Sequence, residues 1–448
     1  MLTSQEATDR AADLVARAIK AGADAADSVY AGRMSTQVQM RLGALEDVER
    51  SEGEQIGLRV FVGRRSASAA SSDLSSAALA AVAERVVAMA REAPEDQFSG
   101  LAPHDRLMQT AVPELDLDDP SDVSPAALRE RAMAVEDAAR AVAGITNSDG
   151  ASAGHGRAVR ALATSHGFVG GYQNSSHGAS ASVVAGSGDS METDYYSNSA
   201  RHLSDLEPPE NVGREAGERT VARLDARKLK SGPMPIIFDR RVAASLLGHL
   251  AGAVTGSSIA RKTSFLLEKL GVRLFDSSIQ IVDDPHRLRG LGSRAFDGEG
   301  LATAKTALIA DGVLTGWLID SASGRQLGLA PTGHASRGVS GPPGVSVSNL
   351  YLENGSTTPA ELMADIKAGL YVTSLIGDGV NGLTGDYSRG ASGRLISNGT
   401  LGHAVSEVTI AGNLIDMFAS LIPANDLMFR NAVNAPSVRI DGMMLAGE

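Results

Sequence analysis

The segment from residue 145 to residue 200 alternates small, polar and apolar residues over most of its length. A period of two residues places alternate side chains on opposite faces of a β-strand. The segment therefore predicts several antiparallel strands with serine and glycine on the outward face. The whole chain has 9 Phe, 7 Tyr and 1 Trp against 49 Gly. We expect its cores to rely on Ala, Val, Leu and Ile, with tight turns at glycine.

The rest of the first half predicts helices packed on this sheet. A Pro- and Asp-rich stretch, residues 94–120, is typical of a long surface linker. We expect one N-terminal α+β domain over 1–228, in which sub-regions 1–93 and 121–228 are joined by this connector. The predicted helices are 5–21, 72–93, 124–144 and about 209–224, and the additional strands are 27–41, 45–53 and 56–63.

The second half, 229–448, is richer in predicted strands. Asn398-Gly399 between two alternating runs predicts a hairpin over 394–412. Taken together, the chain predicts an α+β fold: helices on a mostly antiparallel N-terminal sheet, then a β-rich C-terminal domain of sandwich or barrel type with a few helices. Further strands are expected at 234–239, 280–284, 306–319, 345–353 and 371–377, and a capped helix at 356–369.

Charge and cysteine content exclude several classes of function. The net charge is −12, which repels phosphate backbones and argues against nucleic-acid binding. There is no cysteine and no signal-peptide pattern at the N-terminus, so we expect a cytoplasmic protein without disulfides. Residues 242–260 are uncharged but too polar for lipid. They predict a helix whose glycines let another backbone approach closely, and no membrane association.

Two short motifs are better explained by turns. GLGSRA at 290–295 matches a dinucleotide fingerprint formally, but it lacks the preceding apolar strand and the following helix. Ser388 lies near Asp386 and Arg389 in GDYSRGASG, and turn formation explains this stretch better than a nucleophile does. The chain contains no SxxK motif.

Only one histidine lies on a helix where a zinc peptidase would have its ligands. The stretch SLLGHLAGAVTG, residues 245–256, carries His249 followed by Leu250, where a general base would stand. Ala253 and Val254 occupy the positions one turn later, and neither side chain has a lone pair. A zinc peptidase needs about three protein ligands, and this helix offers one.

These stretches resemble the TldD/PmbA family, also called modulators of DNA gyrase, and within it the PmbA (TldE) branch. The C-terminal motifs carry the resemblance most specifically, and it spans essentially the whole chain. The matching stretches are SLLGHLAGAVTGSSIARKTSFL (245–266), SRAFDGEG (293–300), VNGLTGDYSRGASG (380–393), SEVTIAGNLIDMF (406–418), PSVRIDGMMLAGE (436–448), GADAADSVY (22–30) and GLRVFVGRRSASAASSDLS (57–75).

The resemblance implies a division of labour between two subunits. TldD-type subunits carry an HExxxH zinc helix, while PmbA-type subunits keep the fold and lack the ligands. In this chain the motif frame reads HLAGAV from His249 to Val254, so only the first position survives. The resemblance thus implies a non-catalytic subunit without its own cofactor, paired with a TldD-type zinc subunit in a protease for unfolded or short peptides. Some relatives process peptide antibiotic precursors or degrade antitoxins.

No residue is predicted to be catalytic or to bind metal, and two loops are predicted to line a peptide-binding cleft. The first loop is 290–300 and the second is 378–392. The candidate substrate-binding residues are Arg294, Asp297, Glu299, Asp378, Asp386 and Arg389.

Two alternatives remain open from the sequence. The chain could act as a stand-alone peptide-binding or scaffold homodimer with no peptidase partner. It could also be a metal enzyme with unconventional ligands, such as His249 with carboxylates, which predicts tightly bound metal in the purified protein.

Overall fold

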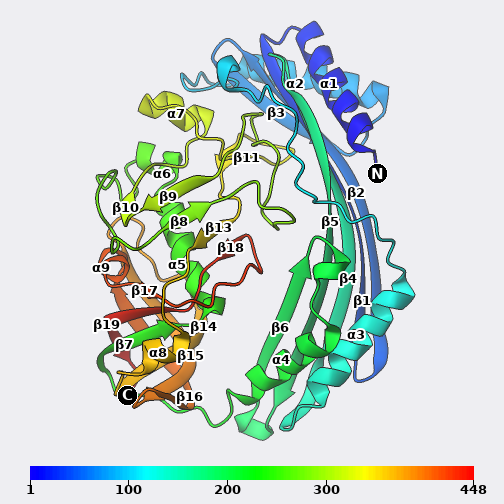
Figure 1. The fold of residues 1–448 in the computed structure, drawn as a ribbon. Helices are drawn as coiled ribbons and strands as arrows, with labels where there is room; N and C mark the ends of the chain where they lie inside the picture. The colour runs from blue at the N-terminus through cyan, green and yellow to red at the C-terminus, as the bar shows by residue number, and fades with distance from the viewer.

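The computed structural model describes residues 1–448 and divides into a long curved sheet with helices and a second, more globular half (Figure 1). The first sheet has six strands in the order β3-β2-β1-β4-β5-β6, and every neighbouring pair is antiparallel. Its strands are β1 (Ala25–Arg41), β2 (Ala44–Val62), β3 (Arg65–Ser71), β4 (Ile145–Thr164), β5 (Val169–Ala185) and β6 (Glu192–Ala200).

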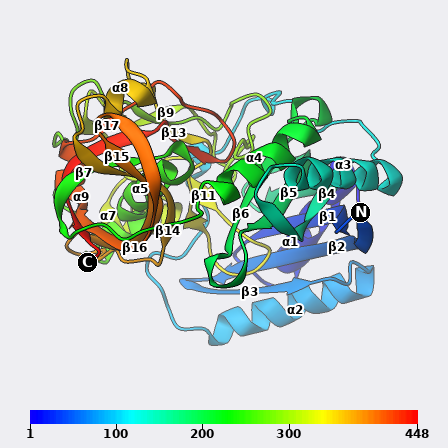
Figure 2. The same cartoon turned by 90° about the horizontal axis from the view of Figure 1, so that it is seen from below.

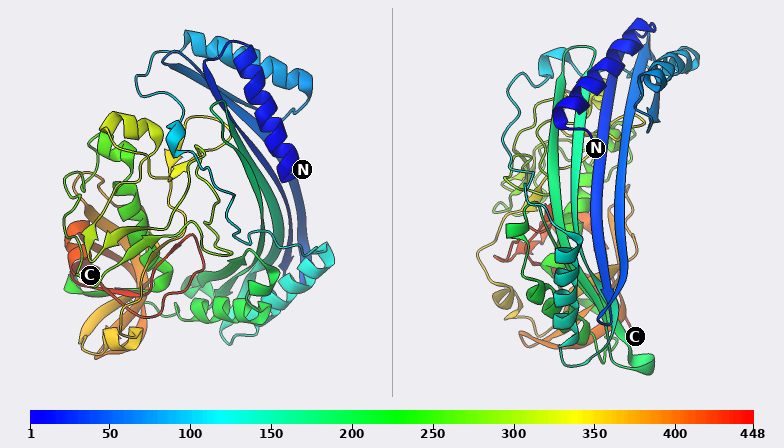
Figure 3. Two further views of the ribbon diagram at one scale, coloured as in Figure 1. Left: turned by 45° about the horizontal axis from the view of Figure 1, so that its top comes forward. Right: turned by 90° about the vertical axis from the view of Figure 1, so that its right-hand side faces the viewer.

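All four long helices of this half cover one face of the sheet. Helices α1 (Ser4–Lys20) and α2 (Ser76–Glu92) pack at one end, where their apolar side chains meet Tyr30 and Leu58. Helices α3 (Pro125–Arg140) and α4 (Pro209–Val221) pack at the other end (Figures 1 and 3). The strands alternate as predicted, so the opposite face is free to meet the second half of the chain.

The second half contains a closed barrel. Strands β16, β15, β14, β7 and β19 pair in that order, and a further pairing of β16 with β19 closes the ring. The predicted α+β fold with a barrel-like C-terminal domain is therefore confirmed. The barrel strands are β7 (Gly232–Phe238), β14 (Ala368–Ile376), β15 (Asp386–Ser397), β16 (Thr400–Asn413) and β19 (Val438–Ala446), and β17 (Ile422–Pro423) extends the sheet beside β19.

A smaller sheet, in the order β10-β9-β8-β13-β18, and several short helices complete this half (Figure 2). The largest apolar core of the second half contains 38 buried residues, which come from the barrel, the small sheet, helix α5 and the segments between them. The remaining elements are α5 (Arg240–Ala253), α6 (Gly256–Ala260), α7 (Ser321–Leu327), α8 (Pro359–Met363), α9 (Leu414–Ala419), β8 (Ile281–Asp283), β9 (Thr306–Ala310), β10 (Val313–Leu314), β11 (Ala335–Ser336), β12 (Gly344–Val345), β13 (Leu350–Leu352) and β18 (Val433–Asn434).

The two halves meet on the helix-free face of the large sheet. Asp27 of β1 is buried there and forms ion pairs with Arg59 of β2 and with Arg337 of the second half. Beside this cluster, Phe168 packs edge-to-face on Phe296 at a centroid distance of 4.9 Å. A buried ionic cluster and an aromatic contact therefore hold the halves together.

Several local predictions differ from the structure. The strands predicted at 45–53 and 56–63 form one continuous strand, β2, because Gly53 at the end of the first run lies in extended backbone and pairs with Arg33. The predicted helix 356–369 ends at Met363, since the chain turns into β14 at Ala368. The predicted strand 306–319 is shorter in the structure: only β9 and β10 form, as a hairpin around its Asp-Gly turn, and β9 also pairs with β8.

The connector 94–120 lies partly in the core and is not a surface linker throughout. Leu107, Leu115 and Leu117 are buried in one apolar cluster with Phe168 and Phe296. The Ser175 N–H also donates to the carbonyl of Leu117 at 2.9 Å. This segment thus fills space between the sheet and the second half.

The glycine face of α5 is also different from the prediction. A Cβ atom added at Gly248 or Gly252 would meet no other atom within 4 Å, whereas one at Gly256 would clash with Ser323. Of the three glycines in this stretch, only Gly256, at the start of α6, is therefore approached closely by another segment of the chain. No helix of the structure has both the length and the apolar content needed to cross a membrane.

Candidate functional site

Helix α5 holds His249 at the edge of the large core. The helix is capped by Asp239, whose side chain accepts a hydrogen bond from the Arg241 N–H at 2.8 Å. Its apolar face, including Leu246 and Leu250, is buried in the core of the second half. His249 lies beside this apolar face on the helix surface and is half-buried.

The residues on this helix do not fit a zinc site. Leu250 and Val254, which stand where the HExxxH frame has a glutamate and a second histidine, are fully buried in the apolar core. No group of three or more His, Cys, Asp or Glu side chains in the chain lies close enough together to hold a metal ion. Zinc sites use three or four such donors, so the donor set around His249 is incomplete.

In place of further ligands, strand β15 brings Tyr387 and Arg389 to His249. The Tyr387 ring packs edge-to-face on the imidazole at a centroid distance of 6.0 Å. Burial lowers the pKa of His249, Arg389 acts in the same direction, and Asp378 opposes both. Burial also raises the pKa of Tyr387 to about 12. At neutral pH the imidazole is therefore uncharged and the tyrosine hydroxyl keeps its proton.

This cluster keeps unused hydrogen-bonding capacity. His249 Nε2, Tyr387 Oη and Arg389 Nε are buried and have no hydrogen-bond partner within the protein. Buried polar atoms of this kind are normally paired. Arg389 is half-buried, so its guanidinium can still donate to a carbonyl oxygen of a peptide, whereas the unpaired atoms of Tyr387 and His249 are closed off from solvent. The cluster has no ligand set to activate water.

The predicted cleft residues fall into separate groups. Arg389 and Asp378 both lie near His249, where Arg389 lowers its pKa and Asp378 raises it. Asp386 points elsewhere and accepts hydrogen bonds from Thr384 at 2.6 Å and Asn413 at 3.2 Å.

The three candidates in the loop 290–300 lie apart from His249. Asp297 accepts hydrogen bonds from three backbone N–H groups, those of residues 299, 301 and 335. Glu299 accepts from the Ser321 N–H at 2.9 Å and hydroxyl at 2.6 Å, and burial raises its pKa to about 7. Asp297 therefore ties the loop to residue 335, and Glu299 ties it to the start of α7.

Arg294 lines a cavity that includes neither His249, Tyr387 nor Arg389. It donates to the backbone oxygen of Ser346 at 2.8 Å, and burial lowers its pKa. The cavity has a volume of about 250 Å³ and is also lined by Arg160 and Arg201. The candidate residues of the two loops therefore do not form one continuous wall, and their role in substrate binding stays a prediction.

Tyr387 is the residue that sequence reasoning missed. It lies between two candidates, Asp386 and Arg389, in a stretch interpreted only as a turn. Side chains two residues apart on a strand share a face, so a strand over 386–397 puts Tyr387 with Arg389 and turns Asp386 away. Recognising this strand would have found the pair.

Family models match the chain in three consecutive parts. The PmbA/TldA metallopeptidase domain 1 matches residues 29–90, the central domain matches 118–224, and the C-terminal domain matches 231–447. The chain is 38% identical over 427 residues to the metalloprotease PmbA of Escherichia coli O157:H7, covering 95% of this chain and 93% of that protein. It is 35% identical to a metalloprotease PmbA homolog of Haemophilus influenzae, covering 99% and 96%.

Solved structures have the same fold. A proposed modulator of DNA gyrase from Bacteroides thetaiotaomicron superposes with a TM-score of 0.92 at 28% identity over the full length of both chains. TldE from Thermococcus kodakarensis superposes with a TM-score of 0.86 at 20% identity, covering 99% of this chain and all of that one.

Proposed function

Because the chain belongs to the PmbA/TldD family of metallopeptidases, we propose that it is the PmbA/TldE-type, non-catalytic subunit of a heterodimeric zinc metalloprotease. Its partner is a TldD-type subunit that supplies the zinc site, and this chain binds no metal of its own. The substrates are unfolded or short peptides. The absence of cysteine in this chain is consistent with the cytoplasmic location that we propose for it.

One observation carries this proposal: the helix at the position of the zinc motif packs apolar side chains into the core where zinc ligands would stand. Leu250 and Val254 belong to the apolar core, and the cation Arg389 lowers the pKa of the remaining histidine. A nearby guanidinium disfavours a bound dication for the same reason that it disfavours imidazolium. Zinc in the partner would polarise the scissile carbonyl and activate water, while this subunit binds and orients the peptide.

Reconstitution with a TldD-type subunit tests the proposal directly. The purified chain is assayed on casein alone and with the partner, and zinc is measured in the same samples. We expect turnover only in the mixture, and less than about a tenth of a zinc per isolated chain, since a complete zinc site retains its metal through purification. Chelator-sensitive turnover by the isolated chain would contradict the proposal.

The candidate residues are tested in the same assay. We propose that Arg294 and Arg389 bind the peptide, so R294A/R389A should lower turnover by the pair about tenfold, because two charged donors are lost. The matched control is Arg214→Ala, which removes an exposed guanidinium on α4. Unchanged turnover in the double variant would remove both residues from the binding site.

A further inference from the structure

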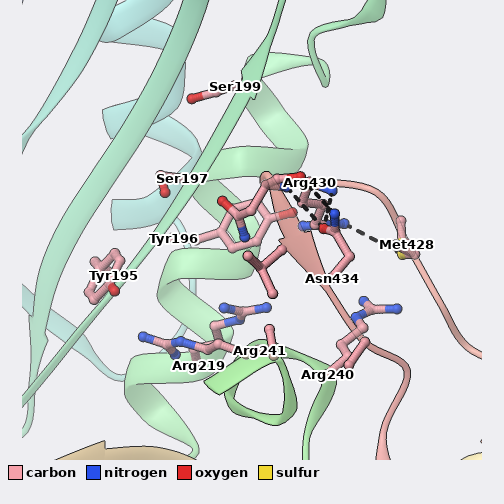
Figure 4. A pocket seen from close by; sticks show the side chains of 14 residues that line it. Tyr195, Tyr196, Ser197, Ser199, Arg219, Arg240, Arg241, Met428, Arg430 and Asn434 are labelled. Carbon is pink, nitrogen blue, oxygen red and sulfur yellow. Dashed lines mark hydrogen bonds between the residues drawn. The ribbon is translucent and has the colours of Figure 1, made fainter. Parts of the chain in front are cut away.

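A cavity of about 210 Å³ lies where β6 and α4 meet the start of α5 and the segment 428–435. Four arginines surround it, and none of its fourteen lining residues is a carboxylate (Figure 4). The chain as a whole has a net charge of −12, and this cavity nevertheless brings four guanidinium groups together between the two halves. The four residues are Arg219, Arg240, Arg241 and Arg430.

Carboxylates behind the cavity hold three of these guanidinium groups in place. Arg241 binds Asp194 through two hydrogen bonds, at 2.6 and 3.0 Å. Arg430 forms an ion pair with Glu207 at 3.0 Å, and Arg219 forms one with Glu215 at 2.8 Å. These pairs use only part of each guanidinium's five N–H donors.

Two tyrosine rings orient the same three groups. The guanidinium carbons of Arg219 and Arg430 lie 4.5 and 5.1 Å from the centre of the Tyr196 ring. The guanidinium carbon of Arg241 lies 4.8 Å from the centre of the Tyr195 ring. A planar guanidinium stacked on a ring loses little further entropy when it binds an anion, so the cavity is organised before a ligand arrives.

Arg240 is the fourth group, and its side chain has neither an ion pair nor a hydrogen bond, although the residue is half-buried. The first N–H groups of α5 are already bonded, to Ser437 and to Asp239. The free donors at this end of the helix are therefore those of the Arg240 side chain. A partly desolvated cation without a partner is unfavourable, and an incoming anion would relieve that cost.

The cavity opens onto a polar surface that suits an extended chain. Ser197 and Ser199 of β6 are exposed and line both this cavity and a groove along the sheet, in which only one of sixteen lining residues is hydrophobic. β6 is an edge strand, and residues 192–200 make no backbone–backbone hydrogen bond outside the sheet. An edge of this kind can pair with an added peptide strand.

We propose that the four arginines bind the free α-carboxylate at the end of a peptide whose preceding residues lie along β6. This inference rests on the proposed peptide-binding function and assigns it a polarity, with the C-terminus of the peptide anchored between the two halves of the chain. Carboxylate geometry matches the guanidinium fork. The volume is several times the roughly 30 Å³ share of one water, enough for a carboxylate and a short side chain.

Fluorescence anisotropy with the full chain tests the proposal. The probe is an uncharged seven-residue peptide, labelled at its N-terminus and prepared with either a free carboxylate or a C-terminal amide. We expect the free acid to bind about tenfold more tightly than the amide, and Arg240→Gln to reduce this preference below threefold. R214Q, which changes an exposed arginine of α4 outside the cavity, should keep the full preference.

Each result decides the matter. Equal affinity for acid and amide, or a preference that R240Q leaves unchanged, would overturn the proposal. The Arg240 side chain makes no bond in the protein and carries a desolvation cost, so R240Q should melt at or above the wild-type temperature, which keeps the comparison valid. Inorganic phosphate should displace the free-acid peptide; phosphate that binds in an Arg240-dependent manner without displacing it would also overturn the peptide assignment.

The outcome separates this inference from the proposed function. Equal binding of acid and amide, with turnover by the reconstituted pair intact, refutes only the proposed carboxylate site. A clear preference for the acid, with no turnover by the pair, refutes the proposed function and supports the carboxylate site.

Discussion

The exposed glycines of α5 give the sharpest stability prediction. Gly248 lies inside the helix and Gly252 in its last turn, and an added Cβ at either position meets no atom within 4 Å. Alanine stabilises a helix interior by about 1 kcal/mol relative to glycine. The last turn contributes less, so we expect G248A/G252A to stabilise the second half by about 1.5 kcal/mol.

Thermal unfolding followed by circular dichroism measures this change. For a domain of this size, about 1.5 kcal/mol corresponds to a rise in Tm of roughly 3–6 °C. The matched control is Gly256→Ala, whose Cβ would lie 2.9 Å from Ser323 Cβ and should destabilise by about 1–3 kcal/mol. A lower Tm for G248A/G252A would refute the reasoning, because it would mean that this face is packed in solution.

Two further predictions concern buried charge. Asp27→Ala leaves Arg59 and Arg337 buried without their carboxylate, so it should lower the free energy of unfolding in urea at pH 7 by about 3–5 kcal/mol. Burial alone would raise the pKa of Asp27, but the two arginines hold this pKa below its ordinary value. The stabilisation by Asp27 should therefore be lost as the pH falls below about 4. The pKa of Glu299 shifts in the opposite direction. Burial raises this pKa to about 7, so near neutral pH the folded state holds a proton that the unfolded state has released. Stability of the wild type should therefore fall by about 2–3 kcal/mol between pH 5 and pH 8 relative to E299Q, and parallel pH profiles of the two proteins would contradict this.

Elements set by neighbouring residues are predictable from this sequence. The hairpin at Asn398-Gly399 forms as expected, with both residues at positive φ, 48° and 76°. The alternation of 145–200 likewise becomes β4, β5 and β6. In both cases the turn chemistry and the period of the pattern lie within one short stretch.

Features set by distant residues are not predictable in this way. The leucines of the connector stand mostly among polar residues, and they become core residues because distant side chains such as Phe168, Phe296 and Leu162 pack on them. The candidate cleft residues were chosen from two loops, but their tertiary positions separate Arg294 from Arg389 and its neighbour His249. Residue type identified the polar loops, and the fold decides which of them share a site.

The closing strand of the barrel has a consequence for how the protein is made. β19 pairs with β7 and with β16, and about two hundred residues separate β19 from β7. The ring cannot close until residues 438–446 have left the ribosome, whereas the long antiparallel sheet of the first half can form earlier in synthesis. Contacts this distant in sequence form slowly. During that interval β7 lacks one neighbouring strand and the apolar face of α5 lacks part of its cover, so the nascent second half exposes apolar surface that favours aggregation.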